Sequence, residues 1–88
     1  AAGATLYHGA EEATGLPPAV EVVDTVGAGD TALAGLLDSL MRKPAAPAEE
    51  HLRWALAAGA AACTAAGFAP PHPSLVATLA GHVEIVPG

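Results

Sequence analysis

Basic residues are scarce in this sequence, and their scarcity excludes several classes of partner. Three of the 88 residues are lysine or arginine, against nine aspartates and glutamates, so the formal net charge is -6 at pH 7. Such a chain is repelled by the phosphates of a nucleic acid and by an anionic membrane surface. We therefore expect neither nucleic acid nor a membrane among its partners.

Cysteine, long hydrophobic runs and targeting signals are also lacking. The single cysteine, Cys63, excludes an internal disulfide and favours a reducing, cytoplasmic location. The most apolar stretch, residues 54–69, is short, rich in alanine and interrupted by glycine, so it does not predict a membrane span. No signal-peptide pattern is present. The chain begins with Ala1 inside an apolar pattern, and we expect it to be a piece of a longer protein.

Alanine is the most abundant residue and occupies 23 positions. A chain of 88 residues can form one small domain.

The first quarter of the chain is predicted to form extended structure. We expect a strand at residues 3–8, a polar hairpin turn at residues 9–15 and an extended segment at residues 20–23. Pro17 and Pro18 exclude a central strand at their own position and favour an edge strand or an extended entry to the next segment.

Apolar residues at helical spacing dominate the rest of the chain. Pro44 ends the first helical pattern, and His72 with Pro73 can cap the third. The second pattern has a face of alanine and glycine that a neighbouring backbone or a flat ligand can approach closely. The expected elements are helices at residues 28–43, 48–67 and 74–80 and a last short strand at residues 83–86.

The most informative segment is residues 23–31, Val-Asp-Thr-Val-Gly-Ala-Gly-Asp-Thr. It leads from an apolar stretch through two glycines into the first helix. Free backbone N–H groups and the helix dipole favour an anion there. Asp30 would repel a bound phosphate, yet it suits a site that must also take a proton from an attacking hydroxyl. The structural alternative is that Asp30 caps the helix, as Thr31 or Thr25 could also do.

Two other glycine-rich motifs fit this segment less well. A phosphate-binding loop of the Walker A type requires a lysine, and none is nearby. The spacing of Gly27, Gly29 and Ala32 formally matches a dinucleotide-binding fingerprint. That fingerprint needs an acidic residue at the end of a second strand, whereas Glu49 and Glu50 open a helix.

Residues 24–31 resemble the D-T-x-G-A-G-D signature of the ribokinase/PfkB carbohydrate kinases. Further similarity lies at residues 1–3, in the alanine-rich residues 57–64, and at Gly67 and residues 70–71, so that the resemblance covers most of the chain. The continuation G-A-G-D-T-A-L-A-G-L-L is most similar to the fructokinase-like branch. The implied fold is α/β, the C-terminal portion of a ribokinase-like doubly wound fold with a β-hairpin and about three helices.

The resemblance implies ATP-dependent phosphorylation of a sugar hydroxyl, with Mg²⁺ on the phosphates. Asp30 would bind the sugar hydroxyl and act as the general base, and the N–H groups of Gly27, Ala28, Gly29 and Asp30 would form the anion hole. Residues 1–88 would be the C-terminal ATP-binding and catalytic part of the kinase, without its N-terminal sugar-binding part. We therefore expect the isolated chain to be inactive, and the resemblance allows a homodimer of the full-length protein.

The resemblance also implies binding sites for the nucleotide and for a monovalent cation such as K⁺. The nucleotide site would comprise Gly3, Leu56, Gly59, Ala60, Cys63 and Gly67. The cation ligands would be Asp24 and Val26, completed by carbonyls near Cys63, Ala66 and Phe68. Alternatively, Asp24 only hydrogen-bonds amides of its turn. Leu56 stands where some relatives have Asn, and Ala65 where the family often has Arg, and both positions bear on nucleotide preference.

A second hypothesis for the function is a noncatalytic nucleotide-binding module or remnant, and a dinucleotide-binding segment ranks below it. The four histidines show no metal-ligand spacing, and we expect them on the surface. Cys63 is expected to be a small buried hydrophobe. Tyr7 and Trp54 are expected in the core or in an interface.

Overall fold

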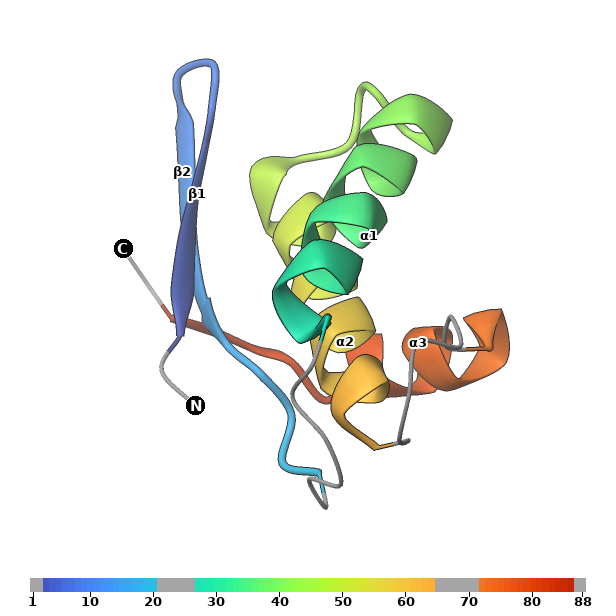
Figure 1. Ribbon diagram of the computed structural model, residues 1–88. Helices are drawn as coiled ribbons and strands as arrows, with labels where there is room; N and C mark the ends of the chain where they lie inside the picture. The colour runs from blue at the N-terminus through green and yellow to red at the C-terminus, as the bar shows by residue number, and fades with distance from the viewer. Residues whose placement is uncertain (1–2, 21–26, 65–71, 87–88) are drawn as a thin grey trace.

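Three strands and three helices make up the protein in the computed structural model, which describes residues 3–20, 27–64 and 72–86. Figure 1 shows the hairpin at one side and the helices at the other. In chain order the elements are β1 (Ala4–His8), β2 (Glu11–Leu16), α1 (Ala28–Arg42), α2 (Ala48–Cys63), α3 (Pro73–Ala80) and β3 (Glu84–Val86). The α/β class and the hairpin with three helices are confirmed.

The strands form one antiparallel sheet in the order β1-β2-β3. The expectation of a polar turn over residues 9–15 is wrong, because only residues 9–10 turn and Glu11–Leu16 forms β2. Gly9 makes this short turn with a positive φ of 61°. Ala13 and Gly15 are buried on the helix side of β2, and this alternation of buried and exposed residues is what makes the segment a strand.

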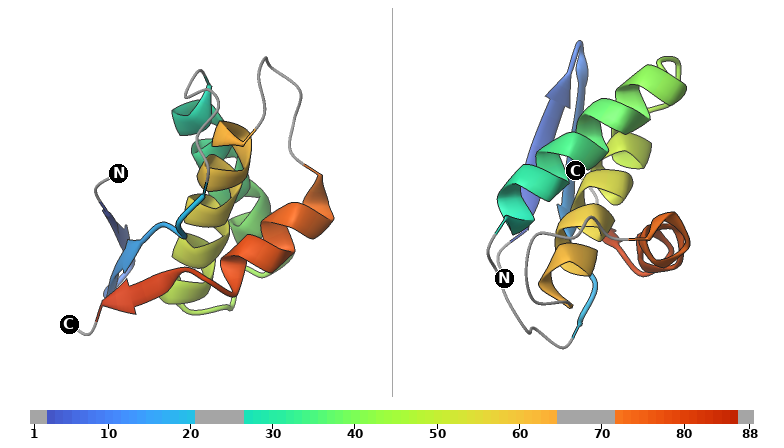
Figure 2. Two further views of the ribbon diagram at one scale, coloured as in Figure 1. Left: turned by 90° about the horizontal axis from the view of Figure 1, so that it is seen from below. Right: turned by 45° about the vertical axis from the view of Figure 1, so that its right-hand side comes forward.

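Helix α2 is the centre of the molecule. It contacts every other helix and strand, whereas α1 and α3 contact α2 alone among the described elements (Figure 2). Small residues allow this close packing, since a Cβ on Gly35 of α1 would lie 2.7 Å from the Cβ of Ala58. The core is correspondingly thin; its buried apolar residues are Ala13, Ala48, Leu52, Ala55, Ala57, Ala58, Ala60, Ala61, Val76 and Val83.

The fully buried residues of helix α1 are small, and three of its large apolar residues are exposed. Gly35 and Ser39 are buried against α2. Leu33, Leu37 and Met41, four residues apart along the helix, are 56%, 53% and 83% exposed. The apolar spacing therefore predicts the helix correctly, but shape selects the face that packs, because only small side chains permit two helix backbones to approach so closely.

The expectation that all four histidines lie on the surface is wrong for His51, which is the largest fully buried side chain. Its Nδ1 shares a 2.8 Å hydrogen bond with the Ser39 hydroxyl of α1. The rings of His51 and His8 pack edge to face, with centroids 5.4 Å apart. Enclosure of α2 between α1 and the hairpin buries this position. Tyr7 is 73% exposed and does not belong to the core.

His72 caps helix α3, as the sequence predicts. Its Nδ1 accepts a hydrogen bond from the Ser74 backbone N–H at 3.1 Å, and Pro73 is the first helical residue. The cap satisfies one of the N–H groups that every helix leaves free at its start.

Arg53 connects α2 to the far end of α3. Its Nη1 donates to the carbonyl oxygens of Val83 at 3.0 Å and Ala80 at 3.5 Å. Arg53→Met keeps most of the apolar stem and removes these bonds, so we expect the free energy of unfolding to fall by about 1–2 kcal/mol. Urea unfolding of the full-length protein measures this loss.

Arg42→Met is the matched control for Arg53→Met. The Arg42 guanidinium reaches only Asp38, one turn away on the same exposed helix surface, at 3.1 Å. Such a pair contributes about 0.3–0.5 kcal/mol. Equal losses for the two variants would contradict the role of Arg53 in holding α3.

Candidate active site at the start of helix α1

Helix α1 starts at Ala28, and the backbone N–H groups of its first turn have no partner within the helix. Gly27 is the N-cap residue, in a left-handed conformation with φ of 77°, and among the described residues no side chain caps the helix. Asp30 is the third residue of the helix and is exposed. The alternative that Asp30 caps the helix is therefore wrong. Within residues 27–64 the helix start therefore carries a carboxylate and has no capping side chain.

Glycine at position 29 leaves open space beside this turn. A Cβ placed on Gly29 would meet no atom of the described residues within 4 Å, and its φ is not positive. Neither packing nor backbone conformation in the described part of the chain therefore requires a glycine here. The opposite holds for Gly27, whose positive φ disfavours any residue with a Cβ.

A pocket of about 600 Å³ opens against the first turn of α1. One wall comes from α1, a second from α2, and a third from the segment that follows β2. The lining residues are Pro17, Pro18, Ala19, Val20, Ala28, Gly29, Ala32, Leu56, Gly59, Ala60 and Cys63. The volume is within the range of pockets that bind a nucleoside-sized molecule.

Contact between small residues joins the two helical walls. A Cβ on Gly59 of α2 would lie 3.1 Å from the Cβ of Ala32 and 3.4 Å from the carbonyl oxygen of Ala28. The glycine thus lets α2 approach the first turn of α1. As a result, the helix start and the alanine–glycine face of α2 belong to one surface.

The structure brings together several residues that sequence analysis assigns to two different roles. Ala28 and Gly29, from the predicted anion hole, line the pocket together with four predicted nucleotide-binding residues, Leu56, Gly59, Ala60 and Cys63. Gly27 and Asp30 flank them on the same turn. Gly3 does not line this pocket. The predictions for Asp24, Val26, Ala66, Gly67 and Phe68 lie outside the described residues.

The third wall of the pocket, residues 17–20, was not predicted from the sequence. The pair Pro17 and Pro18 predicts the absence of a central strand and an edge or extended segment, but no contact with the helices. Two successive prolines also stiffen the chain and remove two backbone donors, which suits an apolar wall. That property was the available signal, but nothing in the sequence indicated which helix the segment faces.

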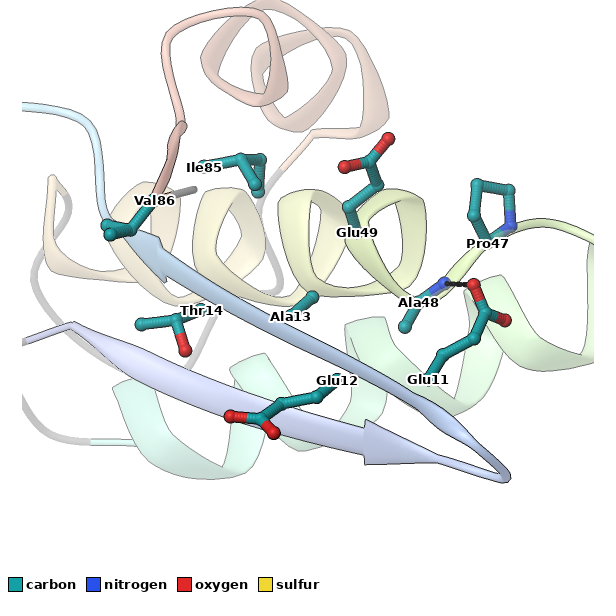
Figure 3. Close-up of a pocket in the computed structure, with 9 residues that line it drawn as sticks. All are labelled: Glu11, Glu12, Ala13, Thr14, Pro47, Ala48, Glu49, Ile85 and Val86. Atoms are coloured by element: carbon teal, nitrogen blue, oxygen red, sulfur yellow. Dashed lines mark hydrogen bonds between the residues drawn. The ribbon is translucent and has the colours of Figure 1, made fainter. Parts of the chain in front are cut away.

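A second pocket lies between the hairpin and the start of α2 (Figure 3). Three glutamates line it, but their carboxylates do not converge, since Glu12 and Glu49 point in different directions. Glu11 accepts a long hydrogen bond, 3.4 Å, from the backbone N–H of Ala48. Because the N-cap residue Pro47 provides no side-chain cap, the strand supplies the acceptor to the helix. Capping of helix α2 therefore explains why the Glu11 carboxylate lies at this pocket.

We expect Glu11→Ala to lower the free energy of unfolding by about 0.5–1 kcal/mol, because it removes an acceptor and a negative charge from a helix start. Glu12→Ala, one residue along and directed away from α2, should change it by less than about 0.5 kcal/mol. Urea unfolding at low and at 1 M salt measures both, and the Glu11 effect should shrink in salt. An equal effect of the two variants would contradict the capping role.

Comparison with known protein families identifies the class of this protein. The matching family is described as pfkB family carbohydrate kinase, and the match covers residues 1–75. The chain belongs to the pfkB family of carbohydrate kinases. Its three antiparallel strands and three helices are consistent with a fragment of a ribokinase-like fold. No protein of curated function gives a significant match. Within the described residues, no helix has the length and apolar character to cross a membrane.

Proposed function

We propose that residues 1–88 carry the nucleotide-binding and catalytic part of an ATP-dependent sugar kinase. The observation that supports this most is the shared pocket: the start of α1 and the alanine–glycine face of α2 line one cavity, with Asp30 exposed on the adjoining turn. Phosphoryl transfer depends mainly on positioning and on stabilising charge. A phosphate site and a proton acceptor within one helical turn serve both needs.

The γ-phosphoryl group of ATP would lie at the first turn of α1. The backbone N–H groups of Gly27, Ala28, Gly29 and Asp30 would donate to its oxygens, where negative charge is redistributed during transfer. The open space at Gly29 lets the phosphate approach the backbone. Mg²⁺, held mainly by the phosphate oxygens, would neutralise part of their charge.

Asp30 would act as the general base. The sugar hydroxyl attacks the γ-phosphorus, its proton passes to the Asp30 carboxylate, and the bond to the ADP oxygen breaks. A carboxylate at this position costs some phosphate affinity through repulsion, and the positive end of the helix dipole offsets part of that cost. Its exposure leaves room for a sugar above the turn.

The nucleoside part of ATP would lie against α2, beside Leu56, Gly59, Ala60 and Cys63. A cation site at Asp24 remains a proposal based on the sequence. A carboxylate and backbone carbonyls are the hard oxygen ligands that such a cation prefers.

The test is an ADP-release assay of the full-length protein with ATP, Mg²⁺ and a panel of ketoses, aldoses and pentoses, beginning with fructose. We expect sugar-dependent ADP release together with a phosphorylated sugar detected by mass spectrometry. Saturable nucleotide binding without transfer to any sugar would instead support the noncatalytic nucleotide-binding module. Absence of both would contradict the proposal.

A further inference from the structure

A buried polar pair joins α1 to α2. His51 of α2 is fully buried, and its Nδ1 lies 2.8 Å from the hydroxyl of Ser39 on α1, which is 9% exposed. Either group can donate this hydrogen bond, according to the tautomer of the ring. Among the described residues, the second ring nitrogen of His51, Nε2, has no hydrogen-bond partner. An apolar residue of similar size would avoid the cost of burying that nitrogen, so stability alone does not explain a histidine here.

The spacing of Ser39 and Asp30 places them on opposite faces of α1. They are nine residues apart, which is about 2.5 turns of an α-helix. Ser39 is buried against α2, whereas Asp30 is exposed. The rotation of α1 about its own axis that brings Ser39 to His51 is therefore the rotation that turns Asp30 outwards.

The large apolar residues of α1 do not select this rotation. Leu37 lies seven residues from Asp30, about two turns, and so shares its face of the helix. Leu37 is 53% exposed, and Leu33 and Met41 are exposed beside it. Turning α1 by half a turn would bury these side chains, which the hydrophobic effect favours. The same movement would carry Asp30 towards α2.

We infer that His51 is a positioning residue for the proposed general base: through Ser39 it holds the rotation of α1 that turns Asp30 towards the substrate. The inference rests on the proposed function, because it takes Asp30 to be the base. The close contact of Gly35 with Ala58 lets the helices approach, but small side chains fit one another in more than one rotation. A hydrogen bond requires a particular distance and angle, so it is lost when α1 rotates. Buried polar groups fix one arrangement among several in this way in coiled coils.

Apolar replacement of the pair tests the inference. Ser39→Ala combined with His51→Leu in the full-length protein removes both partners together, so stability should stay constant or rise. The hydrogen bond then no longer fixes the rotation of α1, and kcat should fall by about 10- to 100-fold, as a misplacement of about 1 Å can cause. The KM for ATP should change little, because the N–H groups at the helix start point along the axis. A stable double variant with the wild-type kcat would overturn the inference.

His51→Asn is the conservative variant. Its side-chain amide takes the place of Nδ1 and keeps the bond to Ser39, whereas its smaller volume leaves a cavity and lowers stability. We expect kcat per folded molecule to stay near the wild-type value, so the less stable protein is the more active one. A merely structural role predicts the reverse order, and that order would overturn the inference. Arg53→Met, which lowers stability through contacts with Ala80 and Val83, is the control and should leave kcat per folded molecule unchanged.

Carboxyl footprinting separates this inference from the kinase proposal. Labelling with a carbodiimide and an amine, measured by mass spectrometry, reports the exposure of the Asp30 carboxylate and needs neither sugar nor nucleotide. Relative to Glu12 of the hairpin, labelling of Asp30 should fall in the double variant and stay at the wild-type level in His51→Asn. Unchanged labelling in the double variant would overturn the inference whether or not a sugar is phosphorylated.

Discussion

Asp30→Asn is expected to lower kcat of the full-length kinase by about 10²–10⁴-fold, the usual loss when a general base is removed. The KM for ATP should change little, because the amide keeps the size of the side chain and leaves the backbone N–H groups in place. Asp30 is exposed on the first turn of α1, so the substitution should cost no more than about 1 kcal/mol of stability, from its interaction with the helix dipole. Steady-state kinetics with the preferred sugar and a thermal melt measure both effects.

Asp38→Asn is the matched control for Asp30→Asn. It makes the same chemical change on the same helix, at a carboxylate whose partner is Arg42, 3.1 Å away on the surface. Turnover should stay within about twofold of the wild type, because loss of a surface ion pair costs only a few tenths of a kcal/mol. Near-normal turnover of Asp30→Asn would contradict the general-base assignment and leave Asp30 with a helix-dipole role.

Gly29→Ala is expected to impair catalysis without impairing the fold. The added Cβ meets no atom of the described part of the chain, so stability should stay constant or rise by up to about 1 kcal/mol, the helix-propensity difference between alanine and glycine. In the proposed complex that Cβ occupies space which the γ-phosphoryl group needs beside the N–H groups. We expect kcat/KM for ATP to fall, and Gly29→Val to fall further, on the order of 10²–10³-fold, as when an oxyanion-hole contact is lost.

Gly35→Ala, two turns along α1, should show the opposite behaviour. Its Cβ would lie 2.7 Å from that of Ala58 across the helix contact. Overpacking costs about 1–3 kcal/mol, which exceeds the gain in helix propensity, so the melting temperature should fall. Turnover per folded molecule should stay near the wild-type value. If Gly29→Ala folds, binds ATP and transfers phosphate normally, the proposed phosphate site at this turn is wrong.

The helices illustrate how far the sequence predicts this fold. Pro44 ends α1 two residues after Arg42, and His72 caps α3, because both effects act within one helical turn. The hairpin was predicted with the wrong turn length. Glu11 and Glu12 are polar enough to suggest a turn, but on a strand with one exposed face they are ordinary solvent-facing residues.

Part of the candidate site, like part of the fold, could be predicted from the sequence, and the rest could not. Residues 27–30 were found from the sequence because a glycine turn, a helix start and a carboxylate lie next to one another in the chain. The apolar wall at residues 17–20 was missed, and its position depends on how the segment after β2 passes α1 and α2. Burial of His51 was missed for the same reason, since its partners Ser39 and His8 belong to two other elements.

By itself, the sequence determined the α/β class, the start of α1 with Asp30 in its first turn, the limits of α1 and α3, and membership of a carbohydrate kinase family, because these depend on neighbouring residues and on a specific motif. Tertiary structure alone decided which residues share the pocket. Gly59 can approach Ala28 only when two helices pack through their small residues, and that contact joins positions about 30 residues apart. Local propensity carries no information about such a contact, since it arises from the shapes of two surfaces that meet only in the folded chain.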